Sequence, residues 1–288
     1  MTSLVSLDNQ KKVVYYDENY DSAFVGHDEG KTISDFMVGK GFTRLGAIQL
    51  RDWMAYVTTR EVAPHTSVVF AMDMVPQEIF GDVDGNILFR RYLDAGGRVT
   101  WLADVPTWYK GKPGKEREDV WQLGSFVSLL GIAPVLANCV KPVELTSRGR
   151  ELGLRLAWYS MRPILVNKDW FCEYSAKSAI SGMPVEVLAW TNVTLGTSVV
   201  RIPSRWHRLR SFSAGIQALG VGGQVTVVGS ESTRIYNKRC ASAWHIAFNP
   251  HHPNQGFFRI WDHVVRLLDL NEERLLEVYN IATRNLSI

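Results

Sequence analysis

Carboxylate side chains follow three of the hydrophobic runs in the first hundred or so residues of the chain. The runs and the acids that follow them are 13–16 with Asp17 and Glu18, 68–71 with Asp73, and 99–102 with Asp104. If these runs are neighbouring parallel strands, a ligand would bind just beyond their carboxyl ends. Two carboxyl groups held close together there could include one that stays protonated, as general acid–base or nucleophilic chemistry at a glycosidic bond requires. We therefore predict Asp17, Glu18 and Asp73 as catalytic residues and Asp104 as a substrate-binding residue.

The same acids have two other interpretations. In folds of this kind, an acid after a strand can hydrogen-bond the hydroxyl groups of a ribose. An acid in this position can also cap the following helix and stay solvated, which is a purely structural role. The sequence leaves these alternatives open.

A second group of polar residues lies in the aromatic segment 244–263. Three histidines and two asparagines fall within the ten residues 245–254. Neutral imidazoles are good bases and metal ligands, but the spacing differs from the helix-borne His-Glu-x-x-His zinc motif. Two prolines in this segment predict an irregular loop. We predict no metal here and expect His245 and Asn249 to form a wall of the ligand site; an interface loop and a structural loop remain alternatives.

Further binding candidates are aromatic or basic. The segment 106–118 is rich in Gly, Pro and Lys, and a loop of this length inside a domain is often a lid. Trp108 and Tyr109 in this loop could stack on a flat ligand. Arg162, just before Pro163, could hold a carboxylate or phosphate with two hydrogen bonds, and a surface ion pair is its alternative role.

Strands that alternate with helices must position these residues. Hydrophobic runs predict strands at 11–16, 42–48, 67–72, 98–103 and 132–136, and apolar spacing of three and four residues predicts helices at 32–39, 49–61, 86–95 and 120–130. This order predicts an α/β fold with a mostly parallel sheet. After it, short strands at 156–159, 185–190, 198–202 and 224–228 follow a short helix at 146–152, and a helix at 272–281 closes the chain. We expect one domain over 1–288, with a sheet–helix core at 11–140 and a β-rich, loop-rich extension at 141–288.

The stretch 68–104 resembles the class I glutamine amidotransferase-like superfamily, and especially its divergent trehalose-utilisation-type branch. The similar residues are Val-Val-Phe-Ala-Met-Asp at 68–73, Leu-Phe-Arg-Arg-Tyr-Leu-Asp-Ala-Gly-Gly at 88–97 and Arg-Val-Thr-Trp-Leu-Ala-Asp at 98–104. The resemblance implies a three-layer, flavodoxin-like fold. Amidotransferases of this superfamily carry a nucleophilic Cys in a sharp turn after a central strand. Here that turn is Ala-Met-Asp-Met-Val at 71–75, so glutamine hydrolysis by this route is not expected.

Composition and missing motifs exclude several classes. The 32 basic and 29 acidic residues are interspersed, which argues neither for nor against nucleic acid. One basic and aromatic patch, at 205–210, is weak evidence for it, so no nucleic-acid partner is predicted. No stretch approaches the roughly 18 continuous apolar residues of a membrane span. Three widely spaced cysteines without a Cys-x-x-Cys pair indicate reduced thiols in the cytoplasm. The chain lacks a P-loop, a Gly-x-Gly-x-x-Gly fingerprint and a Gly-x-Ser-x-Gly elbow, so no cofactor is predicted.

Two functions remain. The leading hypothesis is a hydrolase or glycosyl-transfer-type enzyme that acts on a hydroxyl-rich small molecule, either a sugar or a nucleoside. The alternative is a non-catalytic ligand-binding or oligomerisation module, as amidotransferase-like domains without the nucleophile are, and this alternative predicts a homo-oligomer.

Overall fold

The computed structural model describes sixteen stretches of the chain. They are residues 10–23, 25–59, 62–81, 87–102, 106–120, 129, 135–136, 141–155, 159–160, 164–165, 185–195, 199–201, 226–228, 236–248, 256–261 and 271–284. Among these residues, no helix is both long enough and apolar enough to cross a membrane.

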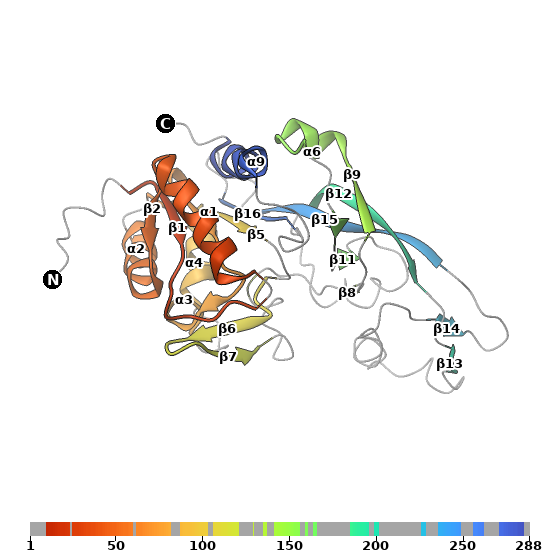
Figure 1. Ribbon diagram of the computed structural model, residues 1–288, viewed down its shortest axis with the longest axis horizontal. Helices are drawn as coiled ribbons and strands as arrows, with labels where there is room; N and C mark the ends of the chain where they lie inside the picture. The colour runs from red at the N-terminus through yellow and green to blue at the C-terminus, as the bar shows by residue number, and fades with distance from the viewer. Residues whose placement is uncertain are drawn as a thin grey trace.

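Five parallel strands form one half of an 11-stranded sheet (Figure 1). Their order across the sheet is β2 (Thr43–Leu45), β1 (Lys12–Tyr15), β3 (Ser67–Phe70), β5 (Arg98–Leu102) and β16 (Gly256–Trp261). Every residue of β3 and β5 is buried, as expected for hydrophobic strands covered on both faces. The predicted α/β class is therefore confirmed, together with four of the five strands predicted for its core.

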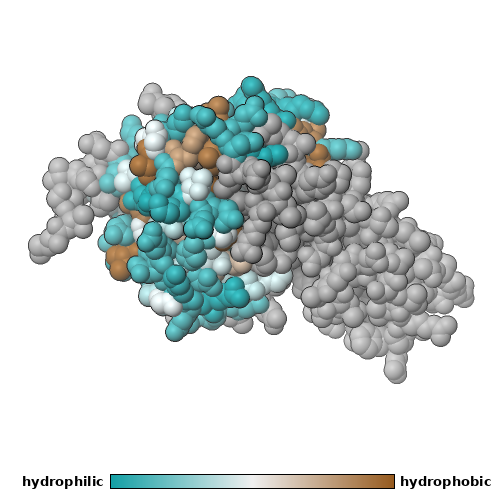
Figure 2. All heavy atoms as spheres, viewed as in Figure 1, coloured by the Kyte–Doolittle hydropathy of each residue, from teal (hydrophilic) through white to brown (hydrophobic). Residues whose placement is uncertain are grey.

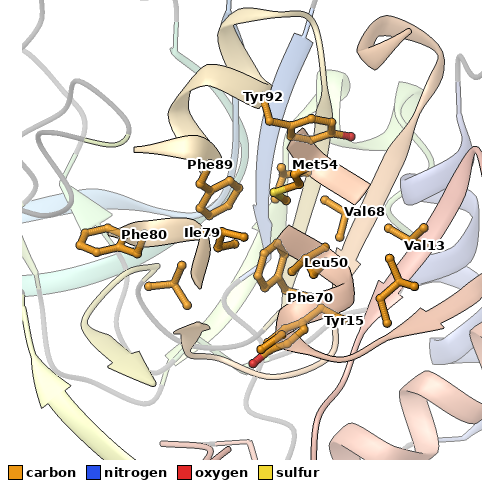
Figure 3. Close-up of a cluster of buried hydrophobic side chains, with 14 of the residues drawn as sticks. Val13, Tyr15, Leu50, Met54, Val68, Phe70, Ile79, Phe80, Phe89 and Tyr92 are labelled. Carbon is orange, nitrogen blue, oxygen red and sulfur yellow. The ribbon is translucent and has the colours of Figure 1, made fainter. Parts of the chain in front are cut away.

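Helices pack on both faces of these strands. On one face lie α2 (Ala47–Thr59), the short α3 (Gln77–Phe80) and α4 (Leu88–Asp94), with the 3-10 helix η2 (Ala63–His65) leading into β3. On the other face lie α1 (His27–Gly39) and α9 (Glu272–Thr283). Figure 3 shows the core beneath α2, α3 and α4, where the ring of Phe70 stacks on Phe89 and Trp101 at centroid distances of 5.2 and 4.9 Å.

Antiparallel strands continue the same sheet beyond β16. The next strands are β15 (Tyr236–Phe248), β12 (Val185–Leu195), β9 (Lys141–Leu145) and β10 (Tyr159–Ser160). The two-residue strand β11 (Ile164–Leu165) pairs with β15, and β8 (Val135–Leu136) pairs with β11. The long pair β12 and β15 extends away from α1 and α2 (Figure 1). A separate parallel pair is formed by β13 (Val199–Arg201) and β14 (Thr226–Val228). The second half is thus rich in strands, as predicted.

Two local predictions are confirmed and one helix begins earlier than predicted. The closing helix is α9, and the short helix near residue 146 is α6 (Ser147–Glu151), capped by Thr146 Oγ1, which accepts the Gly149 N–H at 2.9 Å. The helix predicted at 32–39 is α1, which begins at His27 and therefore contains Thr32. Its hydroxyl donates to Asp28 O, one turn back within the helix, and the chain enters α1 at Gly26 in an extended conformation.

Two segments predicted as loops contain strands. Residues 106–118 include most of a hairpin, β6 (Tyr109–Lys112) and β7 (Glu116–Asp119), which extends the two-residue strand β4 (Val75–Pro76) into a three-stranded sheet. The turn at Gly114 and Lys115 has positive φ at both residues, so the Gly and Lys in this segment form a tight turn instead of a long loop. The beginning of the His-rich segment, up to Phe248, belongs to β15, where pairing with two neighbouring strands overrides the loop pattern.

Candidate functional site

The chain reverses direction across the sheet at β1. From β1 it goes to β2 on one side and then to β3 on the other, so the loops after β1 and β3 diverge from neighbouring strand ends. This is the topological switch point, where open α/β sheets bind their ligands. Asp17 and Glu18 lie in the first loop and Asp73 lies in the second, as the sequence predicted.

Asp73 holds the two loops together. Its carboxylate is 1% exposed and accepts hydrogen bonds from Ser22 Oγ at 2.8 Å, Ala23 N at 2.9 Å and Val25 N at 3.2 Å. Each bond to an ionised carboxylate is stronger than a bond between neutral groups. Asp73 therefore has a structural role in fixing the β1–α1 loop, and its catalytic role stays a prediction.

Asp17 caps a helix. Its Oδ2 accepts the N–H of Ala47, the first residue of α2, at 2.9 Å, and its Oδ1 accepts the N–H of Asn19 at 3.0 Å. Gly46 makes room for this contact, since a Cβ there would lie 2.7 Å from Asp17 Oδ2. The carboxylate is still partly exposed, whereas Glu18 beside it is fully on the surface. Asp17 thus has a capping role, but the helix it caps is α2 and not α1, which directly follows its strand.

Tyr15, Tyr20 and Glu78 lie close to Asp17, since the charges of Asp17 and Glu78 act on both tyrosine hydroxyls. We call Tyr15, Asp17, Tyr20 and Glu78 the switch-point cluster. The hydroxyl of Tyr20 donates to Glu78 Oε1 at 2.6 Å, and Gln77 Nε2 lies 3.4 Å from the same oxygen. The hydroxyl of Tyr15 and the second oxygen of Glu78, Oε2, are buried, and neither has a hydrogen-bond partner among the described residues.

The ring of Tyr15 belongs to the hydrophobic core, and its hydroxyl belongs to the switch-point cluster. Its ring is fully buried and packs on Phe70 at a centroid distance of 5.4 Å. Its hydroxyl points away from the labelled hydrophobic side chains (Figure 3). The apolar part of the ring therefore stabilises the fold, while the polar end faces the carboxylates.

Both tyrosines of the cluster hold their protons strongly. Burial raises the pKa of Tyr15 well above its ordinary value, and the negative charges of Asp17 and Glu78 raise it further. Burial also raises the pKa of Tyr20, followed by its hydrogen bond to Glu78 and the charges of Glu78 and Asp17. Both hydroxyls are thus hydrogen-bond donors at neutral pH.

The β6–β7 hairpin packs on the β1–α1 loop. Lys115 N donates to Asn19 O at 3.0 Å, and Arg117 Nη1 lies 3.8 Å from Asp21 Oδ2. Trp108 and Tyr109 at its base are partly exposed and stack on each other, with centroids 6.2 Å apart. The Trp108 indole N–H donates to Asp119 Oδ2 at 3.2 Å, and the guanidinium of Arg117 lies 5.1 Å from the Tyr109 centroid. The two aromatic residues proposed as a lid are therefore held by the hairpin itself.

His245 is not brought to the switch point. His245 lies within β15, and its backbone is level with Arg259, Thr100, Val69 and Val14 in the middle of the sheet. Three strands separate β15 from β1. Asp104, Arg162 and Asn249 lie outside the described residues. Among the described residues, no group of three or more His, Cys, Asp or Glu side chains could hold a metal ion.

Sequence reasoning missed Tyr20 and Glu78. Glu78 lies in α3, whose four residues are too few to show a helical period. Its partner Tyr20 is 58 positions away in the chain. The available signal was Pro76 followed by Gln-Glu, because proline just before a helix and an acid in its first turn mark a helix start.

Comparison with known proteins identifies the family. The model of the MJECL34 family matches residues 10–186, which is more than half of the 288-residue chain. The uncharacterized protein MJECL34 of Methanocaldococcus jannaschii is 30% identical over 162 residues, 54% of this chain and 52% of that protein. The chain thus spans about half the length of the curated relative it matches. No solved structure matches. The matched segment includes the whole switch-point cluster, and the chain belongs to the MJECL34 family.

Proposed function

We propose that this chain is a hydrolase or glycosyl-transfer-type enzyme that binds a hydroxyl-rich small molecule, a sugar or a nucleoside, at the switch-point cluster. The observation that carries the proposal is a pair of buried polar atoms, the Tyr15 hydroxyl and Glu78 Oε2, that have no hydrogen-bond partner in the part of the chain that the structure describes. Leaving a buried polar group without a partner costs about 1–3 kcal/mol. A hydroxyl group of a ligand would satisfy either atom, because it both donates and accepts hydrogen bonds.

The topology supports a ligand site at this position. The order β2-β1-β3-β5-β16, with helices on both faces, corresponds to the flavodoxin-like order 2-1-3-4-5, whose ligand lies at the β1/β3 switch point. We therefore propose a three-layer, flavodoxin-like sheet, in keeping with the resemblance to the amidotransferase-like superfamily. The turn after β3 contains neither Cys nor Ser, so the proposed chemistry is carried by carboxylates instead.

Glycoside hydrolysis uses two carboxyl groups that flank the scissile bond. We propose that Glu78 is one of them, because one of its oxygens is held by Tyr20 and the other is unpartnered. Asp17 is the best placed of the three predicted acids, since it belongs to this cluster and is partly exposed. In this proposal Asp73 fixes the loop, Glu18 lies at the rim, and Trp108 and Tyr109 contact the flat face of the ligand. We propose a cytoplasmic location on the cysteine pattern alone.

Hydrolysis assays test this function. The purified chain would be offered chromogenic glycosides of common sugars and a set of nucleosides, with release of the aglycone or free base as the signal. Glu78→Gln keeps the acceptor for Tyr20 but removes the charge, and we expect it to abolish turnover. Glu272→Gln, an exposed acid at the start of α9, is the matched control and should keep full activity. Turnover that survives both Glu78→Gln and Asp17→Asn would contradict the proposed roles.

The alternative is a non-catalytic ligand-binding or oligomerisation module. It is favoured by the finding that Asp17 and Asp73 both accept hydrogen bonds from the main chain, as structural acids do. Binding of a sugar or nucleoside without turnover would support the ligand-binding form. A stable oligomer in light scattering, without any ligand, would support the assembly form.

A further inference from the structure

Negative charge predominates around the switch-point cluster. Asp17 and Glu78 belong to it, and Glu18 and Asp21 lie on the same loop as Asp17. The basic side chains Lys110, Lys112 and Arg117 of the β6–β7 hairpin, which packs on this loop, are paired with acids. Lys110 and Lys112 lie 3.2 and 3.0 Å from Glu118, Arg117 lies 3.8 Å from Asp21, and the side chain of Lys115 at the hairpin turn is exposed.

The tyrosines on the two sides of β1 differ in the sign of the charges near them. Tyr16 lies near both signs of charge, because Lys31 and Arg44 lower its pKa while Glu18 raises it. For Tyr15 and Tyr20, by contrast, the charged neighbours that act on the pKa are carboxylates. No lysine or arginine among the described residues lowers the pKa of either hydroxyl. The side of β1 that carries the cluster is therefore the acidic side.

The nearby helix terminus does not offset this charge. The amino end of a helix is a common anion site in α/β folds, and α1 begins in the loop that Asp73 fixes. Its first turn carries Asp28 and Glu29, and the Glu29 carboxylate folds back against Gly26. The chain thus places its own carboxylate where an anionic ligand would approach this helix.

We infer that the site selects hydroxyl-rich ligands that are neutral or positively charged and rejects their phosphorylated counterparts. This inference rests on the proposed function and narrows its substrate class to unphosphorylated sugars, amino sugars or nucleosides. Hydroxyl groups of such a ligand would donate to Glu78 Oε2 and accept from Tyr15. A phosphate group would add negative charge beside Asp17 and Glu78 in a partly buried setting, where like charges repel more strongly than in water.

Matched ligand pairs test the inference. Isothermal titration calorimetry on the full chain would compare adenosine with adenosine monophosphate and glucose with glucose 6-phosphate, and would add glucosamine as a cationic sugar. For each pair that binds, we expect the unphosphorylated member to bind at least about tenfold more tightly at low salt. Added salt should reduce this ratio of affinities. Glucosamine should bind at least as tightly as glucose.

Variants distinguish the effect of charge on ligand affinity from the effect of hydrogen bonding. Glu78→Gln should reduce the ratio of the affinities of the two members of a pair, because it removes one charge that repels the phosphate. Tyr15→Phe should weaken the binding of both members and preserve the ratio of their affinities. Glu272→Gln should change neither the affinities nor their ratio. If the phosphorylated member binds equally or more tightly, the inference is overturned while the proposed function stands. If no member binds and no glycoside or nucleoside is turned over, the proposed function fails and this inference fails with it.

Discussion

Gly97 lies against the ring of Tyr92, so closely that a Cβ on residue 97 would overlap the ring carbons. The Tyr92 hydroxyl lies 2.9 Å from Thr66 Oγ1 and accepts the Arg98 N–H at 3.2 Å. The ring therefore bridges the end of α4 and the start of β3 and β5. Gly96 beside it has a different reason to be glycine, since its φ is +97° where the helix ends.

Gly97→Ala should be the more damaging of two neighbouring substitutions. We expect it to lower the free energy of unfolding by about 2–3 kcal/mol, because the Tyr92 ring is buried and cannot move aside. Gly96→Ala should cost about 1–2 kcal/mol through its left-handed backbone alone. Urea denaturation measures both. Gly39→Ala is the control, since nothing lies within 4 Å of a Cβ there, and equal stability of the 39 and 97 variants would contradict the packing.

Asp73→Ala should destabilise the fold. It would leave the donors of Ser22, Ala23 and Val25 without their acceptor, and we expect a loss of about 3 kcal/mol. Asp73→Asn should cost less, about 1–2 kcal/mol, because its amide oxygen can still accept while its NH₂ group faces a donor. A purely catalytic Asp73, as the sequence predicts, would leave the Tm of Asp73→Asn nearly unchanged, and the three hydrogen bonds predict a loss instead. Asp52→Asn, on the exposed side of α2, is the control for thermal denaturation.

Alkaline pH should unfold the protein through its buried phenols. Burial raises the pKa of Tyr15, Tyr20 and Tyr92 in the folded state. Above the unfolded value of about 10, the unfolded chain releases protons that the folded chain retains. Stability from these groups is therefore fully present below about pH 10 and is lost as the pH rises further.

Absorbance of the phenolate near the unfolding transition checks this dependence. We expect a group of tyrosines to ionise only as the circular dichroism signal is lost. Tyr92→Phe should make the fall of Tm with pH less steep, whereas Tyr109→Phe, at a partly exposed position, should leave that slope unchanged. Ionisation of all ten tyrosines before any loss of structure would refute the burial of these three.

Trypsin should cut the β6–β7 hairpin at its turn first. Lys115 is exposed with φ of +62°, whereas Lys110 is only 8% exposed and Pro113 protects the bond after Lys112. We expect the early hairpin product to end at Lys115, as identified by mass spectrometry. Lys115→Gln should delay cutting of the hairpin. Higher salt should speed cutting of the hairpin, because it screens the exposed Arg117–Asp21 ion pair. This pair contributes at most about 1 kcal/mol to stability. Early cutting after Lys110 would mean that the hairpin opens as a whole.

Local patterns predicted the elements that bury an apolar stripe. In α2, the predicted face of Leu50, Trp53, Met54 and Val57 is fully buried. The strands around Val68 and Val99 were equally clear, because residues buried on both faces of a sheet leave a continuous hydrophobic run. These signals are local, so a single sequence carries them.

Tertiary partners could not be predicted in this way. Asp17, Glu18 and Asp73 follow the ends of β1 and β3 as predicted. The contacts of Asp17 and Asp73 to Ser22, Ala47 and the main chain depend on how the loops fold back. The Tyr20–Glu78 pair joins a loop to a four-residue helix. His245 was predicted in a loop because prolines follow it, yet pairing with β12 and β16 makes it part of a strand.

The position of β16 beside β5 constrains the order in which the molecule can be completed during synthesis. β5 ends at Leu102, and its neighbour starts at Gly256. A ribosome that adds about 5–20 residues per second would leave the hydrogen-bonding edge of β5 open for roughly ten seconds or more. Open edges of hydrophobic strands pair readily with other chains. We expect this edge of the nascent chain to stay available to other chains until β16 leaves the exit tunnel.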